Sequence, residues 1–236
     1  LEKITAELDT LENADDRREE LREQYRGMLA EAKGIAAELT EQRRKAAKQL
    51  EGEIVRELSE LDMDKVKMRV AVRTGTKLSA HGCDTVTFEI SVNPGEPEKP
   101  LSKVASGGEL SRIMLALKNV LTAGEDVGML IFDEIDTGIS GHVAQAVAEK
   151  MASIGRYHQV LCVTHLAQIA AMADAQYLVQ KQVTEGRTRT TVRLLDEEGR
   201  VEEVARLIGV TESQQESGMA HARALLLAAQ KWKNGG

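Results

Sequence analysis

The chain has 236 residues, of which 42% are hydrophobic, 29% are charged and 3% are aromatic, enough apolar surface for one large domain or for a domain with an appendage. The net charge of −7 excludes a general attraction to nucleic acid, so any DNA contact requires a local basic patch. Two cysteines, Cys83 and Cys162, are too few for a disulfide framework or a zinc site, and no apolar run approaches the roughly 20 residues that span a bilayer.

The first 61 residues predict a long helical arm. They contain no proline and are rich in Glu, Lys, Arg, Ala, Gln and Leu, which are strong helix formers. Apolar residues recur at heptad spacing and predict a coiled-coil seam: Leu1, Ile4, Leu8, Leu11, Tyr25, Leu29, Ala32, Ala36, Leu39, Ala46 and Leu50. Asp15, Arg18 and Arg22 interrupt this seam, which leaves a loop, a stutter or a polar layer open as explanations for residues 12–24. We expect residues 1–61 to form the arm and 62–236 to form a second domain.

Two alternations of apolar and polar residues follow the arm. Residues 65–73 and 86–92 each place apolar side chains on one face, which predicts two half-buried antiparallel strands joined by a loop with Gly and Ser. All three prolines lie in residues 93–100, which we expect to be an exposed loop.

A glycine turn and an acid-tipped strand dominate the middle of the chain. The turn, residues 105–109, precedes a helix that extends to Leu121. The run 129–132 predicts a strand buried on both faces of a parallel sheet, and Asp133 and Glu134 follow it at the sheet edge where open α/β sheets bind ligands.

The rest of the chain alternates helices and strands around a second strand tip. A helix that ends near Ile154 precedes a strand over 159–164, and His165 lies at its tip. Further predicted elements are a short helix over 166–173, a hairpin of 177–183 with 188–195, and helices over 201–208 and 218–232. This order is typical of the α/β class.

Each of these features also has a simpler structural explanation. Ser106, Gly107 and Gly108 could merely cap a helix, and a histidine at a strand end is more often structural than catalytic. Together, however, they place phosphate-facing amides, a close backbone approach and two carboxylates at one sheet edge. This combination indicates a nucleotide site.

The combination resembles ABC-type ATPase heads, in particular the SMC-like DNA-repair branch. The resemblance covers nearly the whole chain and rests on these segments: 93–97 with 100–101, 104–112, 131–139 and 159–165. It implies the C-terminal lobe of an ABC/SMC-type P-loop ATPase head, with part of a coiled-coil arm. The implied function is an ATPase of DNA double-strand-break repair and recombination in the bacterial cytoplasm, associated with the nucleoid.

The resemblance also implies roles for individual residues. The turn would bind the γ-phosphate of ATP held by a second head, through Ser106, Gly107, Gly108 and Glu109. Asp133 would hold Mg²⁺ through water, and Glu134 would be the general base, a division of roles that suits phosphoryl transfer. His165 resembles the switch histidine that senses the γ-phosphate.

Two departures from the family pattern qualify these roles. No G-x-x-x-x-G-K-[ST] segment occurs, so the chain lacks the loop that cradles the β- and γ-phosphates and we expect it to be inactive alone. Ile139 and Ser140 replace the usual Leu-Asp. The implied partners are an N-terminal lobe of the same protein, a second copy in a homodimer, and DNA, with no membrane. A transporter-type ATPase subunit and a non-enzymatic coiled-coil tether are the alternatives.

Two local basic clusters are candidates for DNA contact. One is Arg43-Arg44-Lys45 with Lys48, and the other comprises Arg187, Arg189 and Arg193. A solvated surface is the commoner explanation of such a cluster, and DNA contact is the alternative.

Overall fold

A computed structural model describes residues 2–103, 107–121, 127–139, 141–184, 187–209 and 215–235, without the side chains of 2–13, 15, 183 and 184. The chain forms two compact units. One comprises the residues up to Gly52 together with Met68–Ile90, and the other comprises Glu53–Lys67 with Ser91–Gly236. The helix α1, Glu2–Ser59, runs without interruption from the first unit into the second. A loop within residues 12–24 is therefore excluded.

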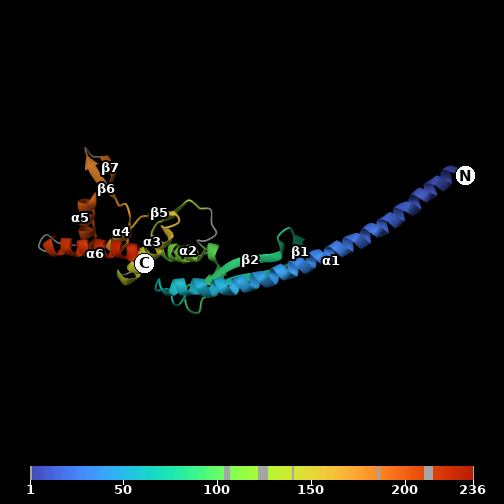
Figure 1. Cartoon of the computed structure of the whole chain (residues 1–236), viewed down its shortest axis with the longest axis horizontal. Coiled ribbons are helices and arrows are strands. Elements are labelled where there is room, and N and C mark those ends of the chain that lie inside the picture. The colour runs from blue at the N-terminus through green and yellow to red at the C-terminus, as the bar shows by residue number, and fades with distance from the viewer. Residues whose placement is uncertain are drawn as a thin grey trace. The chain divides into compact units, whose positions relative to one another are not determined.

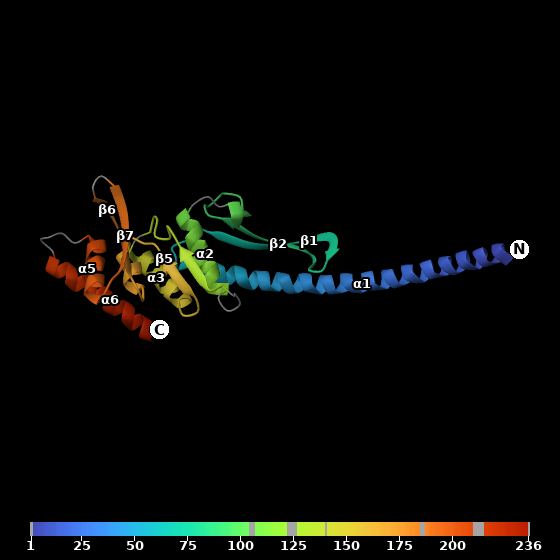
Figure 2. The ribbon, with the colours of Figure 1, turned by 90° about the horizontal axis from the view of Figure 1, so that it is seen from above.

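In the first unit, α1 is accompanied by an antiparallel hairpin of β1, Lys67–Ser79, and β2, Gly82–Ser91. The hairpin lies along the helix, as both ribbon views show (Figures 1 and 2). The expected loop of Gly and Ser is a two-residue turn instead, because the strands continue further than their apolar alternation does. Gly82 has a φ of +85°, a value that glycine adopts readily in such a turn.

The buried stripe of α1 in this unit contains Ala36, Thr40 and Ala47. The heptad prediction placed Ala46 in the seam, but Ala46 is exposed and Ala47 is buried. Further toward the N-terminus, the apolar side chains of α1 are open to solvent: Leu21 is 50%, Tyr25 63% and Met28 62% exposed.

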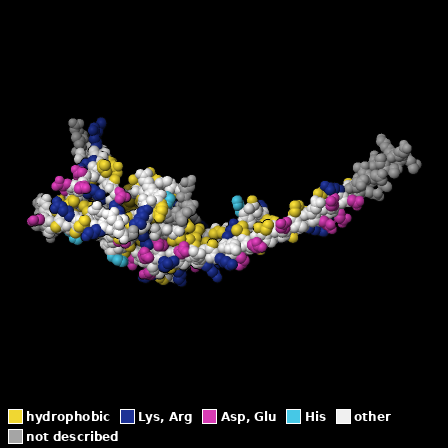
Figure 3. Space-filling model, viewed as in Figure 1, with side chains coloured by type: hydrophobic (Ala, Val, Ile, Leu, Met, Phe, Trp, Pro, Cys, Tyr) yellow, Lys and Arg dark blue, Asp and Glu magenta, His cyan; other side chains and the backbone are white. Residues whose placement is uncertain are grey.

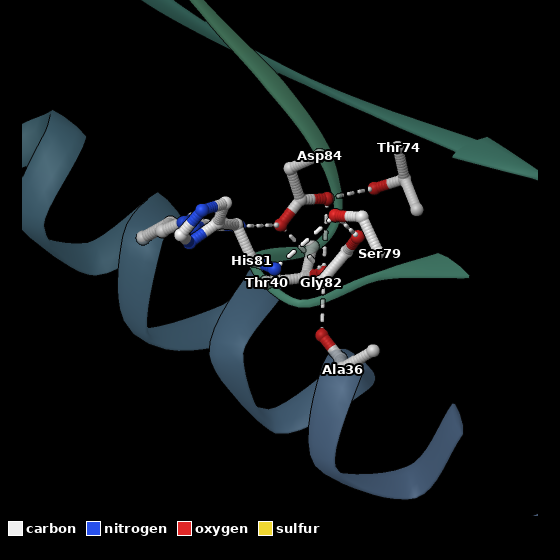
Figure 4. Close-up of polar contacts among 8 residues, drawn as sticks. Ala36, Thr40, Thr74, Ser79, His81, Gly82 and Asp84 are labelled. Atoms are coloured by element: carbon white, nitrogen blue, oxygen red, sulfur yellow. Dashed lines mark hydrogen bonds and ion pairs between the residues drawn. The ribbon is translucent and has the colours of Figure 1, made fainter. Parts of the chain in front are cut away.

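A buried carboxylate fastens the hairpin to the helix. Asp84, whose side chain has no exposed area, accepts hydrogen bonds from Thr40 and Thr74, each at 2.9 Å (Figure 4). It also accepts one from the Arg43 guanidinium at 3.1 Å. Burial opposes ionisation, but the hydrogen bonds from Arg43, Thr40 and Thr74 outweigh it and lower the pKa of Asp84. Of the first basic cluster, Arg43 is thus engaged in the fold.

The second unit has the α/β architecture predicted from the sequence. Its elements are β3 Lys99–Pro100, η1 Leu101–Lys103, α2 Gly107–Leu121, β4 Met129–Phe132, α3 Gly141–Ile154, β5 Gln159–Cys162, α4 Ala167–Met172, β6 Tyr177–Thr184, β7 Arg187–Leu194, α5 Glu197–Ile208 and α6 Gln215–Gly235. β4 and β5 pair in parallel, with Met129 opposite Gln159 and Phe132 opposite Cys162. The predicted parallel sheet is confirmed for these strands.

The expected burial of β4 on both faces is wrong for this chain. Phe132 is buried, but Met129 is 47% and Ile131 is 65% exposed. On the neighbouring strand, Leu161 is 47% exposed, and Val163 just beyond it is 60% exposed. One face of the parallel pair is therefore open, whereas parallel sheets are normally covered on both faces.

The core of the second unit is built largely from helix side chains. Ile113 and Leu115 of α2, Val147 of α3, and Ile54 and Leu58 from the end of α1 are all almost fully buried. The Lys150 ammonium of α3 contacts the carboxylates of Glu57 and Glu60, each at 2.6 Å. Burial lowers the pKa of Lys150, but its hydrogen bonds to these glutamates outweigh that effect and raise it.

The helix α5 has a capping residue at each end. α5 starts at Glu197, four residues before the predicted start, because the Asp196 carboxylate accepts a hydrogen bond from the Gly199 amide at 2.8 Å. It ends at Ile208 and is followed by Gly209, whose φ of +82° is the left-handed conformation favoured after a helix. Within the described ranges, no helix combines the length and the apolar character that a membrane crossing needs.

Candidate nucleotide site

The glycine turn and the acid pair are neighbours in the structure, although 25 residues separate them in the sequence. A Cβ added at Gly108 would lie 3.0 Å from Thr137 Cβ and 3.1 Å from the Glu134 carbonyl oxygen. A Cβ added at Gly107 would collide with the Glu134 carboxylate. Glycine at both positions thus allows the first turn of α2 to pack directly against the loop that follows β4.

The acid pair is exposed and held through its backbone. The Ser111 hydroxyl of α2 donates to the Asp133 carbonyl oxygen at 3.0 Å, and the Glu134 amide donates to Asp133 Oδ1 at 2.9 Å. Glu134 has a φ of +55°, a left-handed conformation that is uncommon for residues other than glycine. Such conformations cost about 1–3 kcal/mol and occur preferentially at functional sites.

The buried side chain of Arg112 donates hydrogen bonds to the backbone of the same loop. It is only 8% exposed, and its Nη1 donates to the carbonyl oxygens of Thr137 at 3.0 Å and Ile135 at 3.4 Å. Its Nε is buried and has no hydrogen-bond partner within the described residues. Burial lowers the pKa of Arg112, and the charges of Glu109 and Asp62 oppose this shift. The sequence offered Arg112 only as part of a matching segment.

Asp136 joins the acid loop to the tip of β5. This carboxylate is 4% exposed and its Oδ2 accepts from the Thr164 hydroxyl at 2.6 Å and the His165 amide at 2.8 Å. The His165 Nδ1 lies 3.0 Å from the same oxygen, while the His165 side chain is 73% exposed. Because the carboxylate accepts a hydrogen bond from Nδ1, the Nε2 atom of the ring faces away from Asp136 and can contact a ligand. The sequence offered Asp136 only as part of the matching segment 131–139.

The Cys162 thiol at this edge has a raised pKa. Burial, together with the negative charges of Asp136 and Asp133, raises the pKa of Cys162 to about 12. A thiol with that pKa stays protonated at neutral pH and is a poor nucleophile or metal ligand.

With this geometry established, comparison with known proteins identifies relatives. No protein-family model matches the chain. It is 42% identical over 249 residues to the DNA repair protein RecN of Bacillus subtilis, which covers 99% of this chain and 43% of that protein. It is also 44% identical over 197 residues to the DNA repair protein RecN of Deinococcus radiodurans, covering 84% of this chain and 34% of that protein. This chain belongs to the RecN family.

The chain spans less than half of the length of the RecN relatives that it matches. Among solved structures, the Smc head domain with a coiled coil and joint from Pyrococcus yayanosii is similar, with 18% identity and a TM-score of 0.47. That similarity covers 66% of this chain and 28% of the solved one.

The structure gathers most of the predicted site residues of this RecN-family chain. Gly107, Gly108, Asp133 and Glu134 are adjacent, and His165 is linked to them through Asp136. Glu109 lies in the first turn of α2 and is half-buried. Ser106 and Ser140 lie outside the described residues.

The donor set fits a magnesium ion that is bound mainly by a nucleotide. Among the residues that the structure describes, no three His, Cys, Asp or Glu side chains cluster as a metal site. Mg²⁺ commonly binds through one or two carboxylates plus substrate phosphates and water, so a single exposed carboxylate such as Asp133 suffices.

Proposed function

We propose that this chain supplies the phosphate-binding turn and the water-activating side of an ATPase head in a RecN-type DNA-repair protein. The observation that carries the proposal is the direct packing of Gly108 against the loop of Glu134 and Thr137. It makes the turn and the acid pair parts of one surface. ATP with Mg²⁺ would supply the phosphoanhydride bond that is cleaved.

Each side chain of the site would have its own role in ATP hydrolysis. The exposed Asp133 carboxylate would hold Mg²⁺ through water. Glu134, whose carboxylate lies beside Gly107, would accept a proton from the attacking water. The His165 ring, held at Nδ1 by Asp136, would meet the γ-phosphate with its other nitrogen.

A two-fold dimer would use both parts of this surface. In such an interface the same patch occurs on both subunits, so the turn of one copy faces the acid pair of the other. Ser106 and the amides of Gly107 and Gly108 would then bind the γ-phosphate of ATP held by the second copy, next to Glu109. The exposed stripe of Leu21, Tyr25 and Met28 on α1 would receive a second helical strand of the arm.

The open face of the β4–β5 pair supports the proposal that a further lobe of the same protein packs there. Met129, Ile131, Leu161 and Val163 are exposed apolar side chains in or directly after parallel strands, a type of strand that is normally covered. A lobe that carries the missing phosphate-cradling lysine loop would cover this face and place its nucleotide beside Asp133. ATP turnover would therefore require that lobe.

The general-base role is tested by Glu134→Gln in the full-length RecN-family protein. We expect kcat for ATP hydrolysis to fall by about 10²- to 10⁴-fold, because the amide cannot accept the proton, while ATP binding persists. Glu198→Gln is the matched control, since Glu198 is an exposed glutamate on α5. An unchanged rate for Glu134→Gln refutes the assignment. Normal DNA repair in cells after Asp133→Ala would instead favour the non-enzymatic tether.

A further inference from the structure

The hairpin of β6 and β7 has two chemically different faces. Its register pairs Tyr177 with Leu194, Val179 with Val192, Gln182 with Arg189 and Leu178 with Arg193. Directly paired residues share a face, and successive residues alternate between faces. One face therefore carries all three arginines of β7, with these described side chains: Leu178, Gln180, Gln182, Arg187, Arg189, Thr191 and Arg193.

The opposite face is apolar at the base of the hairpin and carries Lys181, Thr188 and Thr190 toward its tip. Tyr177, Val179, Val192 and Leu194 lie on it and are each 57–62% exposed. An antiparallel sheet with one apolar and one polar face normally buries the apolar face and leaves the polar one in water. The arginine face is thus the one that stays accessible when the rest of the protein covers this hairpin.

The arginines on this face are not engaged by the fold. All three are exposed, and within the described part of the chain none of them forms an ion pair and no acidic side chain shares their face. The basic cluster on α1 differs, because Arg43 pairs with the buried Asp84 and Arg44 pairs with Glu41 at 2.7 Å. Acidic and basic side chains are also interspersed along α1 (Figure 3). The structure therefore separates two clusters that the sequence left equivalent.

We propose that the arginine face of the β6–β7 hairpin, formed by Arg187, Arg189 and Arg193, binds the phosphate backbone of duplex DNA. This inference rests on the DNA-repair role proposed above. Strand geometry places the three guanidinium groups along about 20 Å, at about 3.4 Å per residue. One DNA strand presents about six phosphates over that length of helix axis. Guanidinium groups match phosphate oxygens through paired hydrogen bonds.

The composition of the face favours a polyanion over a protein partner. Protein interfaces depend on aromatic or aliphatic anchors at their centre, and this face has only Leu178, which is half-buried. Gln180 and Gln182 add neutral hydrogen-bond donors between the arginines. Contacts of this kind position a duplex without reading its sequence.

The test measures binding of a fluorescent 30-base-pair duplex to the full-length protein, without nucleotide, across a range of salt concentrations. The triple variant R187Q/R189Q/R193Q is expected to reduce the slope of log K against log salt by about 2.7, since each phosphate contact contributes about 0.9. The variant R187K/R189K/R193K is expected to retain most of the slope, because it keeps the charges.

The matched control is R44Q/K45Q/K48Q on α1, which removes the same charge. We expect it to leave the slope nearly unchanged. An unchanged slope in the hairpin variant, or an equal loss in both variants, overturns the proposal. Melting temperature and ATP hydrolysis without DNA verify that the hairpin variant is folded. Because binding is measured without ATP, failure here is distinct from failure of the Glu134 assignment, which the hydrolysis rate reports.

Discussion

Replacing Gly108 with alanine tests the contact that unites the glycine turn with the acid loop. The added Cβ would lie 3.0 Å from Thr137 Cβ and 3.1 Å from the carbonyl oxygens of Glu134 and Thr137. Two of these three neighbours are backbone atoms, so a side-chain rotation cannot relieve the crowding. The loop or the start of α2 must shift.

The size of the effect follows from two opposing terms. Overpacking of this kind costs about 1–3 kcal/mol, whereas alanine in place of a helical glycine gains at most about 1 kcal/mol. We expect Gly108→Ala to destabilise the second unit by about 1–2 kcal/mol, or roughly 2–8 °C in Tm. Gly34→Ala is the control, because a Cβ at Gly34 on α1 meets nothing within 4 Å. It should raise the stability of the helix by up to about 1 kcal/mol.

Circular dichroism during thermal unfolding of both variants measures the stability change, and ATP hydrolysis by the full-length protein reports the site. The two substitutions are chemically identical, so opposite signs isolate the effect of the close approach. If Gly108→Ala melts at or above the wild-type temperature and hydrolyses ATP at the wild-type rate, the turn does not pack on the acid loop as described.

Three further perturbations probe other parts of the account. Lys150→Met removes the cation that contacts Glu57 and Glu60 and leaves Glu57 with the hydrogen bond from Asn119, so it should lower the stability of the second unit by about 1–3 kcal/mol in urea unfolding. Asp136→Asn weakens the orientation of His165 and should lower kcat for ATP by about 10- to 100-fold with little change in KM, as steady-state kinetics would measure. The pKa of Asp84 is lower in the folded protein than its ordinary value of 3.8. Its contribution to the stability of the fold is therefore complete above about pH 3.8 and is lost as the pH falls through the pKa of the folded state. Hydrogen exchange should therefore show the β1–β2 hairpin losing protection in acid, whereas Asp84→Asn should lose it already at pH 7; equal protection in both proteins at pH 7 would contradict this role.

Local sequence patterns were sufficient to predict the main elements near the site. The apolar run 129–132 matches β4, and the helix expected after the glycines is α2, which already begins at Gly107. Such runs are bounded by glycine and by charge, so their limits are set locally. The start of α5 was missed because a cap at Asp196 extends the helix beyond its apolar periodicity.

Tertiary relations were harder to predict for a physical reason. Arg112 donates to backbone carbonyl oxygens and Asp136 accepts from a backbone amide, and backbone groups leave no trace in the pattern of side chains. The burial of β4 was overestimated because a run of apolar residues does not show whether another element covers each face of the strand. In this chain one face is open at Ile131 and Leu161.

In the proposed dimer, each ATP is cleaved between the acid pair of one copy and the glycine turn of the other. A mixture of two full-length variants, Ser106→Arg and Glu134→Gln, tests it directly by its rate of ATP hydrolysis. Each variant alone should be nearly inactive. After subunit exchange, half of the dimers should be mixed and each should contain one intact site, which restores about a quarter of the wild-type rate. A mixture that remains as inactive as either variant alone would contradict the account.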